Sequence, residues 1–104
     1  MNRTIPGLFF LIAVMALPHV ANAADVAQGQ TLAKRWCAAC HVVASDQKNG
    51  DTQVPPFSAI AKMPGFDAAK LALYLLLPHP KMPDMNLSRS EAADLAAYIA
   101  TQRE

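Results

Sequence analysis

Apolar and polar positions follow a helical period in three stretches of the chain. Apolar residues recur every three or four positions over 26–39 and 88–101, and they occupy nearly all sides of 67–77. One further short helical turn is indicated over 57–62, after two prolines. No stretch after the first 23 residues shows the period of two that is typical of strands. The pattern therefore predicts an all-α fold.

The predicted helices have recognisable ends. Asp25 and Asp67 are placed to cap the helices that follow them, and Ser88 with Glu91 forms a capping box that opens the last helix. Gly29 lies inside the first helix, where glycine costs about 1 kcal/mol relative to alanine. We interpret it either as a notch that lets the last helix approach closely or as one tolerated weak residue. The apolar face predicted for that last helix comprises Ala92, Leu95, Tyr98 and Ile99.

Two predictions concern the core. The leucines between 71 and 77 lie on nearly all sides of their helix, which indicates burial between a cofactor and the rest of the protein. Met63 is predicted to be a core residue, and Trp36 is either a core residue or a cofactor contact.

Residues 1–23 have the three parts of a secretory signal peptide. Arg3 precedes an apolar stretch from Leu8 to Leu17, and Ala21-Asn22-Ala23 forms a cleavage site. The apolar stretch is about half the roughly 20 residues that span a bilayer. We therefore expect cleavage after Ala23, export to the periplasm and no stable membrane span; an uncleaved anchor is the alternative.

The remaining residues, 24–104, suffice for a single domain. A domain of about 80 residues buries a small core and commonly needs a metal, a disulfide or a large cofactor. Nine Lys and Arg stand against eight Asp and Glu in the whole chain, and Arg3 is lost with the leader. Since no basic stripe is present, nucleic-acid binding is not expected.

The motif Cys37-Ala38-Ala39-Cys40-His41 carries the most specific chemistry of the sequence. On a helical turn its two thiols and its imidazole emerge on one face. This C-x-x-C-H pattern is typical of covalent attachment of haem c, with both thiols forming thioethers and the imidazole binding iron as the proximal ligand. One haem per chain would also supply the missing core.

Three other interpretations of the motif fit the sequence less well. A dithiol redox site should follow a β-strand, whereas helical spacing precedes Trp36. Structural zinc needs four ligands in a spacing that the chain lacks. A disulfide between Cys37 and Cys40 would close a very small loop and leave His41 without a role.

Pro55 is predicted to act on the proximal side. Its carbonyl can accept a hydrogen bond from Nδ1 of the proximal imidazole. The alternative is that Pro55 and Pro56 only stiffen the loop.

A second axial ligand would make the iron six-coordinate, which favours electron transfer. Met82 and Met85 lie in a proline-rich loop before the last helix, and Met82 is favoured, with Met85 as the fallback. His79 would give iron with two histidine ligands and a lower potential, but a lone loop histidine is usually solvated. Met63 follows His41 too closely to reach the opposite face easily.

Together these segments resemble small bacterial class I cytochromes c over nearly the whole chain after the leader. The resemblance is carried by the C-x-x-C-H motif, Pro55-Pro56-Phe57, Lys81-Met82-Pro83 and Asp94-Leu95-Ala96-Ala97-Tyr98-Ile99. It implies that Met82 is the distal ligand, that the Pro55 carbonyl holds the proximal histidine, and that Tyr98 packs near Gly29.

The expected function is one-electron transport without catalysis. Redox partner proteins, such as an oxidase, a reductase or a dehydrogenase, would meet an exposed haem edge in a weak contact. Lys34, Arg35 and Lys81 could steer such partners, although isolated surface cations are usually only solvated. The chain would be a monomer or one subunit of a heteromer. Two alternatives are a haem subunit held permanently by a catalytic chain, and a five-coordinate haem that senses gas or reduces peroxide.

Overall fold

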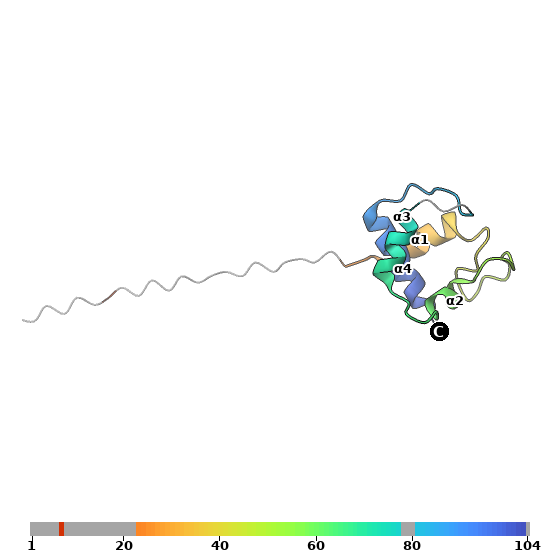
Figure 1. Ribbon diagram of the computed structural model, residues 1–104, viewed down its shortest axis with the longest axis horizontal. Coiled ribbons are helices and arrows are strands. Elements are labelled where there is room, and N and C mark those ends of the chain that lie inside the picture. Colours follow the sequence, from red (N-terminus) through yellow and green to blue (C-terminus); the bar gives the residue numbers. More distant parts are fainter. Residues whose placement is uncertain (1–6, 8–22, 78–80, 104) are drawn as a thin grey trace, which may run out of the picture.

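The computed structural model describes residue 7 and residues 23–77 and 81–103. Four helices follow one another along this part of the chain, and it contains no strand. They are α1 (Val26–Trp36), α2 (Phe57–Ala61), α3 (Ala68–Leu76) and α4 (Arg89–Thr101), as Figure 1 shows. The all-α prediction is confirmed. Most of the predicted leader and His79 lie outside the described residues.

The predicted caps start three of the helices. Asp25 accepts a hydrogen bond from the Gln28 amide at 3.0 Å, and Asp67 accepts one from the Lys70 amide at 3.1 Å. At α4 the Ser88 hydroxyl accepts from the Glu91 amide, while the Glu91 carboxylate accepts from the Ser88 amide. These bonds satisfy amides that no helical carbonyl can reach.

Helices α1 and α4 pack together at Gly29. A Cβ atom added there would overlap the carbonyl oxygen of Asp94 and would lie 2.8 Å from Cβ of Tyr98. Beside this crossing the Asp25 amide donates to Oδ1 of Asp94 at 2.7 Å. Gly29 is therefore the predicted notch, because any side chain at this position would push the two helices apart.

Helix α4 lies at the centre of the fold and packs against each of the other three helices. Leu95, Tyr98 and Ile99 supply its buried apolar face. The Tyr98 hydroxyl donates to the carbonyl of Val43 at 2.7 Å and so joins α4 to the loop that follows the C-x-x-C-H motif. Burial raises the pKa of the Tyr98 phenol, which keeps the hydroxyl protonated as a donor.

The first helix is shorter than predicted. It ends at Trp36 instead of Ala39, and residues 37–40 form turns. The amides of Cys37 and Ala38 both donate to the carbonyl of Ala33, at 2.9 and 3.1 Å. Because the second of these bonds spans five residues, it widens the last turn and stops the regular ladder.

Two predictions about burial were wrong, one of them in part. Leu71 and Leu75 pack against the buried core as predicted, whereas Leu73 and Leu77 are 60% and 54% exposed, because α3 packs only against α4 among the described helices. Met63 is 52% exposed in the connection between α2 and α3 and is not a core residue. No described helix combines the length and the apolar character that crossing a membrane requires.

Candidate functional site

A mostly apolar cavity lies beside the C-x-x-C-H motif. All four helices and the segments at 37–41, 54 and 81–85 contribute to its wall, and its empty space measures about 850 Å³ including the open mouth. Its apolar wall from α2, α3 and α4 includes Phe57, Ile60, Leu71, Leu75, Leu95 and Ile99. Such a cavity suits a large apolar ligand that a few polar groups hold in place.

Both cysteine thiols of the motif line this cavity and are free. The Cys37 carbonyl accepts from the amides of Cys40 and His41, at 3.1 and 2.8 Å, and these bonds close the turn. Burial raises the pKa of the Cys37 thiol to about 11, so that thiol is protonated at neutral pH. Cys40 is exposed. The turn thus presents two thiols and the His41 imidazole to one space.

The His41 ring has a defined orientation. Its Nδ1 atom lies 2.6 Å from the carbonyl oxygen of Pro55. Because a carbonyl oxygen only accepts, Nδ1 must carry the proton, which leaves the lone pair of Nε2 available to a metal. The Phe57 ring packs beside the imidazole with a centroid distance of 5.5 Å.

Two methionines reach the cavity. Met82 is half-buried, Met85 is 9% exposed, and both line the wall. Met63 does not line it. Within the described residues, the candidates for a sulfur ligand are therefore reduced to Met82 and Met85.

Several cavity residues were not predicted from the sequence. Ile60 and Tyr74 line the wall together with Val54, while Leu73 and Leu77 do not. Ile60 lies three residues after Phe57, and Tyr74 lies three residues after Leu71, so helical spacing from a recognised apolar residue could have found both.

Trp36 also lines the cavity while remaining 38% exposed. This position agrees with the predicted role as a cofactor contact and does not agree with the predicted role as a core residue.

The alternative chemistries lack the surroundings that they need. Among the described residues, no group of three or more His, Cys, Asp and Glu side chains is arranged to hold a metal ion. Helix α1 precedes the cysteines where a dithiol redox motif would follow a strand. The groups that line the cavity fit haem c with its iron. They are two cysteine thiols, one imidazole with a free Nε2, two methionine thioethers and an apolar wall.

The comparisons with known proteins agree with this chemistry. The family model "Cytochrome c" matches residues 26–103. Cytochrome c-552 of Bradyrhizobium diazoefficiens is 48% identical over 103 residues, which cover 99% of each chain. Cytochrome c6 of Synechocystis sp. is 31% identical over 108 positions, covering 96% of this chain and 84% of its own. No solved structure gave a significant match.

The matched segment begins at the first residue of α1 and includes all four helices and the whole cavity wall. The chain therefore belongs to the cytochrome c family, whose members bind haem c and transfer electrons and are not enzymes.

Proposed function

We propose that the chain is an exported electron carrier whose single haem is attached through Cys37 and Cys40 and whose iron is held by His41 and Met82. The observation that carries this assignment is that both thiols, the imidazole and the thioether line one apolar cavity. The bound haem supplies one-electron chemistry.

The residues of the chain control that chemistry in three ways. Pro55 holds the proton on Nδ1 of His41 and thereby directs Nε2 to the iron. Leu71, Leu75 and Leu95 keep water away from the porphyrin, because they line the cavity with apolar surface. The soft sulfur of Met82 favours the ferrous state and raises the potential relative to a second histidine.

The position of the chain at residues 81–83 supports Met82 as the distal ligand ahead of Met85. Three successive residues, 81–83, line the cavity, so the main chain runs along its wall at Met82. Met85 also lines the cavity, but it is only 9% exposed and is one of the buried core residues. It remains the fallback.

The position of the expected cleavage site supports export of residues 24–104 as one domain. Ala23 and Ala24 are exposed and precede the first residue of α1. Cleavage after Ala23 would leave the Asp25 cap and its bond to Asp94 in place. The periplasm is the expected location.

The proposed partners are redox proteins that touch the rim of the cavity. Trp36 and Tyr74 both line the cavity and are exposed, by 38% and 52%. Exposed aromatic rings beside a redox centre suit a small contact with a partner protein. We favour a free monomeric carrier, which size-exclusion chromatography of the exported protein would distinguish from a subunit of a stable heteromer.

Absorption spectra of the exported protein in both redox states test the ligand assignment. Met82→Ala should abolish the weak ferric methionine-to-iron band and lower the reduction potential, while the haem stays covalently bound. Met85→Leu is the matched control, since it removes a sulfur and nearly conserves volume. An unchanged ferric spectrum in Met82→Ala, with the band lost in Met85→Leu, would transfer the distal role to Met85.

A further inference from the structure

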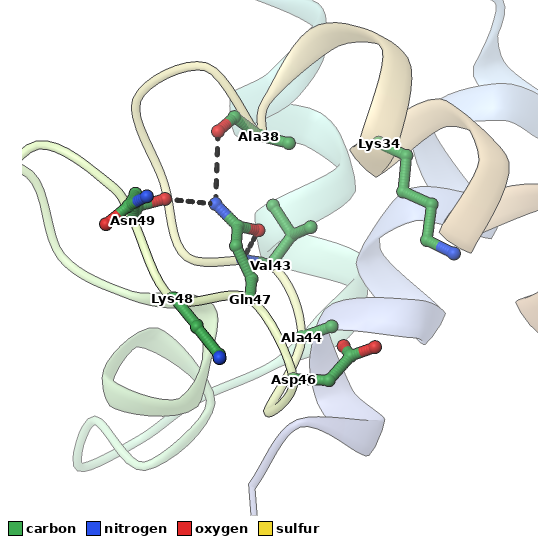
Figure 2. Close-up of a pocket in the computed structure, with 8 residues that line it drawn as sticks. All are labelled: Lys34, Ala38, Val43, Ala44, Asp46, Gln47, Lys48 and Asn49. Atoms are coloured by element: carbon green, nitrogen blue, oxygen red, sulfur yellow. Dashed lines mark hydrogen bonds between the residues drawn. The ribbon is translucent and has the colours of Figure 1, made fainter.

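The side chain of Gln47 reaches into the loop that carries the proximal histidine. Its Nε2 atom lies 3.1 Å from the carbonyl oxygen of Ala38 and 2.8 Å from those of both His41 and Asn49. Its Oε1 atom accepts from the Val43 amide at 2.9 Å. Figure 2 shows this side chain directed toward Ala38, Val43 and Asn49 from inside the loop.

These contacts determine the orientation of the Gln47 amide. Its three carbonyl partners can only accept and the Val43 amide can only donate, so Nε2 must face the carbonyls. Two N–H hydrogens serve three acceptors, so one hydrogen is shared. A carboxylate at position 47 could make none of the three donated bonds.

The Gln47 side chain completes a series of anchors along the loop. The carbonyl of Cys40 accepts from the Asp51 amide at 2.7 Å, and that of Val42 accepts from the Phe57 amide at 2.9 Å. Among the described residues, the carbonyls of Ala38 and His41 have no hydrogen-bond donor other than Gln47. The Gln47 side chain thus connects the C-x-x-C turn and the proximal histidine to the main chain at Val43 and Asn49.

We propose that Gln47 is a positioning residue that fixes the main chain of His41 and thereby the imidazole bond to Pro55. This inference rests on the proposed iron ligation by His41. The His41 amide donates to Cys37, its carbonyl accepts from Gln47, and its ring donates to Pro55, so Gln47 supplies one of three anchors. Without it the ring is less firmly held against the Pro55 carbonyl, which reduces the electron density that the imidazole gives to iron.

The test uses the holoprotein and a matched glutamine of the same loop. Gln47→Leu should speed hydrogen exchange of the His41 ring N–H, measured by NMR in the ferrous state, by about tenfold, the factor that corresponds to one net hydrogen bond. The reduction potential should rise, because weaker donation to iron stabilises the ferric state less. Gln53→Leu is the control, since Gln53 is exposed and its side chain makes no hydrogen bond to another described residue.

A second variant gives a signature that a purely structural role would not produce. In Gln47→Glu the protonated carboxyl can donate one bond, whereas the ionised carboxylate faces three carbonyl oxygens. Its ring N–H exchange, compared with the wild type at the same pH, should therefore be nearly unchanged at acidic pH and approach the ratio seen for Gln47→Leu as pH rises, while Gln53→Glu shows no such step. This variant also tests the inference if Gln47→Leu does not accumulate as a folded holoprotein.

Unchanged ring exchange and potential in both Gln47 variants would overturn the inference, even if the two proteins were less stable. It would equally be overturned if neither Gln47 holoprotein formed while both Gln53 variants did, because Gln47 would then serve loop assembly alone. A wild-type protein without covalently bound haem would instead refute the proposed function itself.

Discussion

The Nδ1 atom of His41 lies 2.6 Å from the carbonyl oxygen of Pro55. The acceptor belongs to the main chain, so its position depends on the path of the loop and not on a side chain. Proline restricts that path by fixing φ in the unfolded chain as well as in the folded one. A substitution at Pro55 can therefore remove the proline ring and keep the carbonyl, so that the two contributions are measured separately.

Pro55→Ala should keep the ferric spectrum of the holoprotein and lower its unfolding free energy by about 0.5–1 kcal/mol. The carbonyl remains, whereas the unfolded chain gains conformations. Urea unfolding followed by the haem absorbance measures the change, with Pro64→Ala as a control at an exposed loop proline. A spectrum that loses axial histidine ligation would show that the ring itself, beyond its carbonyl, is needed to hold His41.

Local signals predicted most of this architecture. Asp25, Asp67 and Ser88 with Glu91 act within one helical turn, so their sequence spacing was enough to start three helices at the right residues. The spacing within the C-x-x-C-H motif was equally local. The contact between Gly29 and α4 is long-range. The glycine alone left a notch and a tolerated weak residue as alternatives, and the family resemblance placed Tyr98 near it.

Contacts between distant segments explain what the sequence did not predict. The sequence gives no signal for the role of Gln47, because nothing in the neighbouring residues predicts its three carbonyl partners. The exposure of Leu73 and Leu77 depends on which helices cover α3, which leucine spacing cannot reveal. Helix α1 ends early because the amides of Cys37 and Ala38 share the Ala33 carbonyl. The sequence of residues 37–39 does not predict this sharing.

Gly29→Ala should destabilise the protein even though alanine favours helices. The new methyl group would overlap the Asp94 carbonyl, and the main chain cannot move aside without separating α1 from α4. We expect a loss of about 3 kcal/mol in unfolding free energy, at the upper end of the usual cost of overpacking. Gln28→Ala, at the exposed neighbouring position of the same helix, should change it by less than about 0.5 kcal/mol.

Thermal unfolding of both holoproteins measures this difference. If Gly29→Ala were as stable as Gln28→Ala, the close packing of the two helices at this point would be contradicted.

Tyr98→Phe should cost about 1–2 kcal/mol of unfolding free energy. The hydroxyl donates to the Val43 carbonyl at 2.7 Å, and Val43 is 2% exposed, so water cannot readily replace the lost donor. The substituted phenyl ring would still pack edge-on against Phe57, as the tyrosine ring does at a centroid distance of 6.3 Å. Denaturant unfolding isolates the hydroxyl, and a change below about 0.3 kcal/mol would mean that the bond contributes nothing net.

The capping box of α4 should make the protein sensitive to acid. The Ser88 amide and then the Ser88 hydroxyl hold the pKa of the Glu91 carboxyl below its ordinary value of 4.5, and Arg35 of α1 adds a weaker attraction. Because the folded state prefers the ionised form, this stabilisation is complete above the ordinary pKa. It is lost as pH falls through the lower pKa of the folded state.

Glu91→Gln should remove this dependence. A glutamine at the third position can still complete a capping box, so the two proteins should differ least in acid and most near neutral pH. Unfolding free energies of both holoproteins, measured from about pH 6 to pH 3, give a difference curve in which all other carboxyl groups cancel. The wild type should lose its advantage over the variant as pH falls; a difference that stayed constant over this range would show that the Glu91 charge has no part in starting α4.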